Sequence, residues 1–346
     1  MRLHHTQPSR AKVKGRGAAV SERGRRARSL RWVRRLALVA LLALVAYLLA
    51  VPLLAWSRVS RVDADPGGRR PPEQPGTTYL LVGTDSRAGL SAAERRRLHT
   101  GRGGGSRADT VMLLHTGRGP NLLLSVPRAS LLDVPGHGRS MVNAAYEYGG
   151  PELLVETIEQ ATGIRVDGFV QIGFRGVVRL VDAVGGVTIC PAAAMDDRRA
   201  GLHVRPGCQV ADGGRALAYA RSRHAQRLDD LDRAAHQREV VAATGARVLS
   251  WRTFLEPARY WNVMRGGAAS VTVDDRMGPL AFARLAVALR RVDAPHGLTC
   301  GVPITDASVQ SVHWDPERAD ALFGLIRADR TDEISADLCQ SSGLVG

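Results

Sequence analysis

Residues 219–238, YARSRHAQRLDDLDRAAHQR, concentrate side chains that could do chemistry. They include five arginines, two histidines and three aspartates, namely Arg221, Arg223, Arg227, Arg233, Arg238, His224, His236, Asp229, Asp230 and Asp232. Arg221 and Arg223 would point the same way in an extended segment. Asp230, Arg233 and Gln237 would share one stripe of a helix. Guanidinium groups bind phosphate oxygens in pairs, so the cluster indicates a diphosphate site. The alternative is a solvated, salt-bridged helix face.

Further charged residues follow the ends of apolar runs. The run TYLLVG, residues 78–83, is typical of a strand buried on both faces, and Thr84, Asp85, Ser86 and Arg87 come directly after it. Open α/β sheets bind ligands at the carboxyl ends of such strands. After a basic, glycine-rich insertion at 88–106, Arg107 and Asp109 precede a second apolar run. A Gly/Pro turn then returns the chain through 121–126 to Pro127 and Arg128, which predicts a hairpin.

Helical and strand patterns alternate through the rest of the chain. Pro151 suits the first turn of a helix that runs to about residue 161. The next elements are a helix at 174–184, ended by Gly185 and Gly186, and a short strand at 187–189. Later elements are expected at 231–249, 277–292, 298–302 and 316–327. This order predicts an α/β protein whose sheet has helices on both sides.

The net charge of +15 is concentrated at the N-terminus. Residues 1–35 carry twelve Lys or Arg and one acid, Glu22, which gives 12 − 1 = +11. Residues 36–56 carry no charge, so 57–346 hold 48 − 12 = 36 basic and 33 − 1 = 32 acidic residues, a net +4. The large domain therefore does not require a nucleic-acid partner.

Residues 36–56, LALVALLALVAYLLAVPLLAW, predict a transmembrane helix. At about 1.5 Å per residue, this length spans a hydrocarbon core of about 30 Å. The basic flank favours a cytoplasmic N-terminus, a cell-membrane location and an extracellular C-terminal domain. A cleaved signal peptide is the alternative, but no small-residue cleavage site follows cleanly. We expect a basic disordered tail at 1–35, a Pro- and Gly-rich linker at 57–76 and a domain at 77–346.

The four cysteines predict disulfides. None lies in a CxxC pair, which argues against zinc, and an even number is typical of exported domains. Pairing Cys190 with Cys208 and Cys300 with Cys339 keeps each loop local. Buried free thiols are the alternative.

Six pieces occur in an order that resembles one family. They are LLVGTDSR, RADT, LLLSVPR, VNAAYEYGGPELLVETIEQATGI, FRGVVRLVDAVGGVTI and ALAYARSRH…DDLDRAAHQRE. Behind an N-terminal anchor, they are similar to the LytR–CpsA–Psr domain, most closely over 77–250. The resemblance implies a three-layer α/β/α sandwich with a central mixed sheet and a long apolar pocket. It also implies a membrane-anchored phosphotransferase that moves a glycopolymer from a polyprenyl diphosphate carrier to the C6 hydroxyl of N-acetylmuramic acid in peptidoglycan, with Mg²⁺ or Mn²⁺.

Within this resemblance, the charged residues acquire roles. Asp85 and Asp109 would hold the divalent cation, because Mg²⁺ prefers carboxylates, waters and phosphate oxygens. Six arginines would contact the two phosphates: Arg87, Arg107, Arg128, Arg221, Arg223 and Arg233. Asp230 would act as a base or orient Arg233, and Asn143 and Gln237 would hydrogen-bond phosphate or sugar. The alternative for Asp85 and Asp109 is turn capping at strand ends.

Two positions depart from the family pattern. Ala129 stands where members usually have Asp, and His236 stands where they usually have Arg. If His236 contacts the phosphates, binding should tighten as the pH falls toward about 6, because an imidazolium is then formed.

Two other functions fit the same residues. One is a non-catalytic, membrane-tethered receptor for cell-wall glycopolymer or a polyprenyl-phosphate lipid. The other is an attenuator of transcription, which the expected topology opposes.

Overall fold

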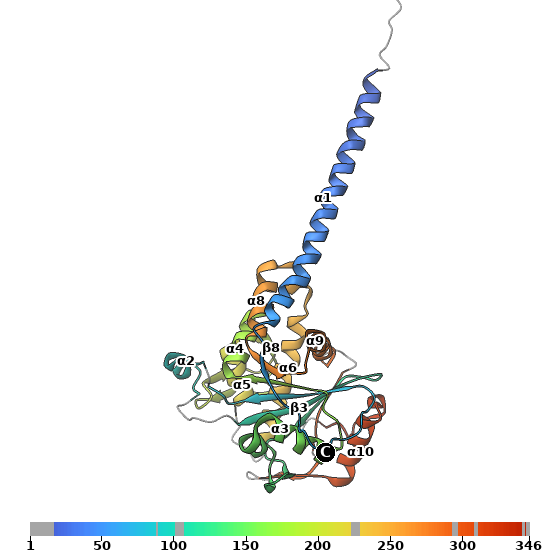
Figure 1. The fold of residues 1–346 in the computed structure, drawn as a ribbon. Coiled ribbons are helices and arrows are strands. Elements are labelled where there is room, and N and C mark those ends of the chain that lie inside the picture. Colours follow the sequence, from blue (N-terminus) through green and yellow to red (C-terminus); the bar gives the residue numbers. More distant parts are fainter. Residues whose placement is uncertain are drawn as a thin grey trace, which may run out of the picture. The chain divides into compact units, whose positions relative to one another are not determined.

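A computed structural model describes residues 17–87, 89–100, 107–222, 229–292, 297–307, 311–340 and 343, with the side chains of 17–31 and 229–232 left out. The chain forms two units, one ending at Val51 and one that begins at Pro52. Figure 1 shows the fold. In the second unit, a sheet has α3 (Val142–Thr162) and α10 (Pro316–Arg327) on one face. The other face carries α4 (Phe174–Ala183), α6 (Asp229–Val248), α8 (Pro257–Ala268) and α9 (Pro279–Val292). The predicted three-layer α/β architecture is confirmed.

Helix α1 runs from Gly17 to Trp56, so it begins inside the segment expected to be disordered. Its part from Trp32 to Trp56 is long and apolar enough to cross a membrane. Only the last turn, from Pro52, belongs to the second unit.

The central sheet has seven strands in the order β1-β12-β7-β2-β3-β4-β13. Their bounds are β1 Ser60–Val62, β12 Val271–Asp274, β7 Gly168–Gly173, β2 Thr77–Thr84, β3 Ala108–Thr116, β4 Leu122–Val126 and β13 Leu298–Gly301. Strand β2 pairs in parallel with β7 and antiparallel with β3, and β3 pairs antiparallel with β4. The sheet is therefore mixed, and the predicted hairpin is confirmed as β3–β4.

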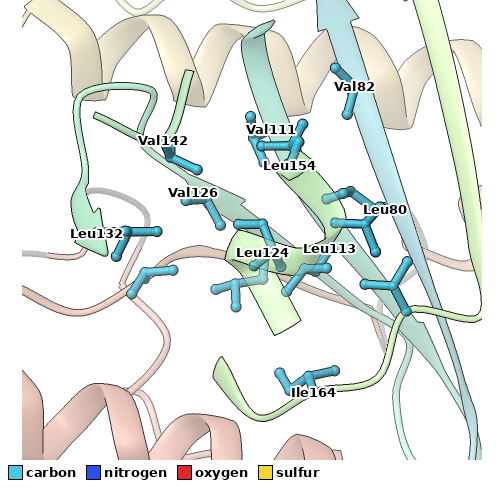
Figure 2. Packing of buried hydrophobic residues seen from close by; sticks show 14 of the residues in the cluster. Leu80, Val82, Val111, Leu113, Leu124, Val126, Leu132, Val142, Leu154 and Ile164 are labelled. Carbon is cyan, nitrogen blue, oxygen red and sulfur yellow. The ribbon is translucent and has the colours of Figure 1, made fainter. Parts of the chain in front are cut away.

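Alternation along the central strands divides the core between the two faces. Leu80 and Val82 of β2 pack toward α3 and α10, and Figure 2 shows them with Val111, Leu124 and Leu154. Tyr79 packs on the opposite face, in the cluster that contains Leu285 of α9. Because both faces are buried, these strands are nearly continuous apolar runs, which made them recognisable in the sequence.

Smaller elements surround this frame. Two-stranded sheets are formed by β5 (Leu131–Val134) with β6 (Gly138–Met141), β8 (Val187–Ile189) with β11 (Gln209–Ala211), β9 (Met195–Asp197) with β10 (Leu202–Val204), and β14 (Ile304–Ala307) with β15 (Val312–Trp314). The remaining helices are α2 (Ala92–Arg97), α5 (Gly213–Arg221), α7 (Trp251–Leu255) and the 3₁₀ turn η1 (Thr331–Glu333).

Residues 57–76, expected to be a linker, make ordered contacts with the domain. Strand β1 pairs in parallel with β12 at the sheet edge. The Arg70 side chain reaches the buried Glu159, with Nη2 2.6 Å from Oε1 and Nε 3.0 Å from Oε2. Glu159 also accepts a bond from the Val166 amide at 2.8 Å, so this buried carboxylate is satisfied by several donors.

Both cysteine pairs expected from the sequence are joined as disulfides. Cys190 bonds to Cys208 across 18 residues, and Cys300 of β13 bonds to Cys339 across 39 residues. The second bond ties an edge strand of the sheet to the segment after α10.

Candidate active site

The ends of three neighbouring strands bring Asp85, Asp109 and Arg128 to one edge of the sheet. The β3–β4 register pairs Val111 with Val126, and continuing it places Asp109 opposite Arg128. Arg128 Nη1 donates to Asp109 Oδ1 at 2.9 Å. Asp85 follows β2, and its Oδ1 accepts a bond from the Arg107 amide at 2.8 Å. The antiparallel order of β2, β3 and β4 thus gathers residues that are distant in sequence.

Close packing at this edge requires a glycine in β2. A Cβ on Gly83 would lie 2.8 Å from Thr110 Cβ on the paired strand, so a side chain there would force β2 and β3 apart. The β2–β3 register shifts between Gly83 and Thr84. The Thr84 hydroxyl after this shift is buried and has no hydrogen-bond partner among the described residues. It is therefore available to a ligand group at the edge.

Arg221 and Arg87 line the same cavity as Asp85 and Asp109. Arg221 is the last residue of α5, which corrects the expectation of an extended segment. Its Nη1 and Nη2 donate to the carbonyls of Leu98 and His99 at 3.0 and 3.2 Å, and its guanidinium lies 4.8 Å over the Phe174 ring. These contacts fix its direction. Burial, followed by repulsion from Arg87, lowers the pKa of Arg221, and an anion between these groups would relieve that repulsion.

Arg87 is anchored in the same manner as Arg221. Its Nε donates to the Thr100 carbonyl at 2.6 Å, and its Nη2 lies 3.9 Å from Asp85 Oδ2.

Helix α6 contributes Arg233 and Gln237 to the same cavity. Arg233 is only 5% exposed, and Gln237 Nε2 donates to the Ala220 carbonyl at 3.3 Å. Arg238, next in sequence, turns to β4 and donates to Ser125 Oγ at 2.8 Å; burial lowers its pKa to about 10. Arg223 lies outside the described residues, and Asp230 belongs to α6 without a described side chain.

These charged groups form one end of a cavity of about 890 Å³ between the sheet and the helices of its second face. The charged residues that line it are Asp85, Arg87, Asp109, Asp197, Arg199, Arg221 and Arg233. The remainder is apolar and is lined by residues such as Leu81, Met112, Val170, Ile172, Met264 and Phe282. Packing voids in protein cores rarely exceed the size of a few waters, so a cavity this large and this apolar is built to hold a ligand.

Three expected site residues lie elsewhere. The Arg107 side chain faces Glu147, with Nε 2.9 Å from Oε2, and is mostly exposed. The His236 ring packs against the Tyr219 ring in a tilted arrangement, with a centroid distance of 4.2 Å, and does not line the cavity. Asn143 is buried at the start of α3, and its Oδ1 has no hydrogen-bond partner in the part of the chain that the structure describes.

Ala129 packs with Ile304 and Val312 in a small apolar cluster. The carboxylate that the family pattern expects there is thus replaced by an apolar contact.

Sequence reasoning missed Asp197 and Arg199. They lie at the turn between β9 and β10 and reach the cavity because this hairpin folds over α5. The four residues DDRR at 196–199 were a signal, but nothing local linked them to the strand ends. Asp197 Oδ1 accepts bonds from the amides of Arg199 and Ala200 at 2.9 and 3.0 Å, which fixes the turn.

Asp85 and Asp109 are the carboxylates of this cavity end that could hold a divalent cation. Both carboxylates line the same end of the cavity, and each retains oxygen lone pairs beyond the bonds described above. Among the described residues, no group of three or more His, Cys, Asp or Glu could hold a metal. Two carboxylates completed by waters and phosphate oxygens are a usual arrangement for Mg²⁺.

Comparison with known sequences gives consistent matches. The family model described as LytR_cpsA_psr matches residues 61–281, more than half of the chain. "Probable cell wall biosynthesis protein LcpB" of Corynebacterium glutamicum is 44% identical over 287 residues, which are 81% of this chain and 68% of that protein. "Polyisoprenyl-teichoic acid--peptidoglycan teichoic acid transferase TagU" of Oceanobacillus iheyensis is 28% identical over 56% of this chain and 58% of its own length.

The fold also matches a solved structure, "LytR-Csp2A-Psr enzyme from Actinomyces oris". The TM-score is 0.61 at 21% identity, over 78% of this chain and 96% of that one. At this identity, the likeness concerns the fold alone.

Proposed function

This chain belongs to the LytR–CpsA–Psr family, and from that premise we propose that it is a membrane-anchored glycopolymer–peptidoglycan phosphotransferase. The donor is a glycopolymer on a polyprenyl diphosphate, and the acceptor is the C6 hydroxyl of N-acetylmuramic acid in peptidoglycan. A relative named as a polyisoprenyl-teichoic acid–peptidoglycan transferase supports this class of reaction.

The observation that carries the proposal is the continuity of the cavity. One end presents Arg87, Arg199, Arg221 and Arg233 beside the carboxylates of Asp85, Asp109 and Asp197, and the remainder of the lining is mostly apolar. A polyprenyl diphosphate has the same division, since a dianionic head adjoins a long hydrocarbon chain. A water-soluble sugar nucleotide would leave the apolar part of the cavity without a matching group.

In the reaction, the acceptor hydroxyl oxygen attacks the phosphorus that carries the glycopolymer. A new P–O bond forms to the acceptor, the P–O bond to the bridging oxygen breaks, and polyprenyl monophosphate leaves. The hydroxyl proton passes to water or to a carboxylate at this end of the cavity. Phosphoryl transfer of this kind depends on positioning and charge stabilisation more than on covalent participation by the protein.

The arginines of the cavity supply both the positioning of the phosphates and the stabilisation of their charge. Arg221 is held in place by two backbone carbonyls and Arg87 by one, so they meet the phosphates without a large loss of side-chain freedom. Arg128 holds Asp109 in position through its 2.9 Å bond. Mg²⁺ or Mn²⁺ held by Asp85 and Asp109 would neutralise phosphate charge when bound.

The proposed location is the cell membrane. The helix Trp32–Trp56 would be a single-pass anchor, and the strongly basic N-terminus would remain in the cytoplasm. The domain would then face outward, where its disulfides persist and peptidoglycan is present.

A pair of glycines in α8 tests the occupant of the cavity. Gly267 lines the cavity, and a Cβ added there meets only Leu180 Cδ1, at 3.4 Å. Gly266 does not line it, and a Cβ there meets Ala183 Cβ at 3.7 Å. We expect Gly267→Leu to weaken binding of a polyprenyl diphosphate to the full chain in detergent at least tenfold, because its side chain fills lipid space. Gly266→Leu is the matched control, since it makes the same change on the same helix.

Equal affinities in the two variants would place the lipid outside this cavity. Weak binding by Gly267→Leu of a short-chain diphosphate as well would show that the variant disturbs the charged end rather than the prenyl space.

A further inference from the structure

Three helices near the start of the folded unit expose large apolar side chains. In α7, Trp251 and Leu255 are 66% and 69% exposed; in α8, Trp261 is 38% exposed; and in α9, Leu280 is 76% exposed. The full set is Trp251, Phe254, Leu255, Trp261, Leu280 and Val287. Helices α7 and α8 pack on each other, and α8 shares an apolar cluster with α9. Isolated exposed apolar residues are ordinary, but six on these three helices indicate a contact surface.

The charge of these helices is mostly positive. Helices α7, α8 and α9 contain six arginines, Arg252, Arg259, Arg265, Arg284, Arg290 and Arg291, and the nearby acid is Glu256, which links α7 to α8 and pairs with Arg259. Arg252 lies 5.6 Å from the Trp251 ring, and Arg265 lies 5.7 Å from the Trp261 ring. Tryptophan beside arginine, with leucine nearby, is typical of protein surfaces at the boundary between lipid headgroups and acyl chains.

The chain itself brings a lipid surface to this place. Trp56 ends the apolar helix, belongs to the folded unit, and packs against Phe282 of α9 at 5.6 Å between ring centroids. Met264 of α8 belongs to the same apolar cluster. Val287 is both exposed and part of the cavity lining, so the cavity lies close to this face.

From these observations we infer that the exposed face of α7, α8 and α9, here called the seating surface, lies on the outer leaflet of the membrane. Its tryptophans and leucines enter the headgroup boundary, and its arginines contact anionic headgroups. A lipid could then move between the bilayer and the cavity without crossing water. The inference rests on the proposed anchoring by the helix Trp32–Trp56, but it does not depend on the transfer reaction.

Tryptophan quenching by brominated phosphatidylcholine tests the seating surface in the full chain. The protein is reconstituted into vesicles of phosphatidylcholine and phosphatidylglycerol, with and without bromine on the upper acyl carbons. All variants carry Trp32→Phe, because Trp32 lies in the apolar helix and would itself be quenched. In that background, replacing Trp251, Trp261, Trp56 or Trp314 singly by Phe shows how much of the quenched emission each contributes. We expect Trp251→Phe and Trp261→Phe each to remove part of the quenched component. Trp314→Phe should leave it unchanged, because Trp314 packs beside Phe323 on the other face of the sheet.

A double substitution that adds two negative charges to the seating surface gives the second measurement. Leu255→Glu with Leu280→Glu should abolish quenching of Trp251, because two carboxylates would enter the boundary beside anionic lipid. Both positions are exposed, so the fold should persist, which circular dichroism checks. Met141→Glu is the control, since Met141 is 40% exposed on the other face of the sheet.

Two results would overturn the inference. Quenching that disappears with Trp56→Phe but is unaffected by Trp251→Phe and Trp261→Phe would mean that the anchor inserts and the seating surface stays in water. The Trp251 emission could also be blue-shifted but not quenched, while the protein cross-links as a dimer. That result would mean that a second copy of the chain covers this face. If Trp56 is not quenched either, the proposed membrane anchor itself is wrong. The quenching of Trp56 therefore distinguishes a failure of the anchor from a failure of the seating surface.

Discussion

Arg221 shows how one side chain serves both the fold and the site. Two of its donors bind backbone carbonyls, and its guanidinium covers Phe174, yet it also lines the charged end of the cavity. Its neighbours include Arg87, whose repulsion contributes to a lowered pKa. This arrangement is electrostatically unfavourable in the free protein and becomes favourable when a diphosphate lies between the two arginines.

Replacement of Arg221 by Ala should therefore impair transfer more than folding. A charge-assisted bond at a desolvated site contributes about 1.5–3 kcal/mol, which corresponds to a loss of roughly 10- to 150-fold in rate. The rate per folded molecule and the thermal midpoint should be measured together. Arg330→Ala, at an exposed arginine paired with Glu333, is the control. A lower midpoint with an unchanged rate per folded molecule would show that Arg221 is structural.

The position of His236 in the structure changes the prediction made from the sequence, in which this side chain contacts the phosphates. Its ring packs against Tyr219, whose hydroxyl donates to Glu239 at 2.7 Å, and it does not line the cavity. We therefore expect His236→Phe to keep the donor affinity and its pH dependence, because a phenyl ring preserves the packing against Tyr219. If His236→Phe loses affinity for the donor only at pH values near 6, His236 does contact the phosphates directly.

At the scale of elements, buried polar contacts fasten the C-terminal segment to the sheet. His115 of β3 is 1% exposed, with Nδ1 2.9 Å from Thr78 Oγ1 and Nε2 3.3 Å from Asp329 Oδ1. Asp329 also accepts a bond from the Arg118 amide at 3.1 Å. Burial lowers the pKa of His115, and the neighbouring carboxylates of Asp329 and Asp167 oppose that shift.

This pKa shift predicts acid sensitivity. The unfolded histidine titrates near pH 6.5, above the folded value, so below about 6.5 the unfolded state binds more protons. The contribution of His115 to stability is thus fully present above pH 6.5 and is lost as the pH falls toward the folded pKa, by about 1.4 kcal/mol per unit of pKa difference. The pKa of Asp167 is raised by burial, and it titrates in a more acidic range with the opposite sign.

Thermal midpoints of the full chain in detergent at pH 7.5 and 5.5 measure this effect. His115→Asn should lower stability at pH 7.5 but flatten the difference between the two pH values. His203→Asn, at a position 81% exposed, should leave the difference intact. Equal pH differences in the parent and His115→Asn would refute the assignment.

The sequence predicted those elements that carry a local signal. The run TYLLVG and the turn at 117–120 predicted β2, β3 and β4, and the helix expected at 316–327 is α10. Strand β7, GFVQIG, was missed although it pairs with β2 at the centre of the sheet, because its glycines and Gln171 resemble a loop. Parallel pairing is set by distant residues, so no local pattern reports it.

The site divides in the same way. Asp85, Asp109 and Arg128 were predictable because each adjoins the end of an apolar strand. Asp197 and Arg199 were not, since a separate hairpin brings them to the cavity. The contact of His236 with Tyr219 depends on how α5 packs against α6, which the spacing of residues does not reveal.

At the scale of the whole molecule, the parts agree on a lipid-linked substrate. An apolar helix precedes the domain, the cavity combines a charged end with an apolar body, and exposed tryptophans and arginines lie on the helices around it. The apolar helix would hold the domain near a membrane, and the cavity would accept a prenyl diphosphate. The exposed tryptophans and arginines would contact the outer leaflet.

The central claim is that this cavity carries out transfer of a phosphoryl-linked glycopolymer, and the phosphorus atoms report it directly. The full chain in lipid nanodiscs is incubated with a glycopolymer on polyprenyl diphosphate, a peptidoglycan acceptor and Mg²⁺, and the products are followed by phosphorus NMR. We predict equal amounts of polyprenyl monophosphate and of a new phosphodiester on peptidoglycan, both lost with chelation of the metal. Donor that stays bound and unchanged would indicate a receptor, and release of polyprenyl diphosphate would mean that the glycosidic bond, rather than the diphosphate, is broken; either result would contradict the account.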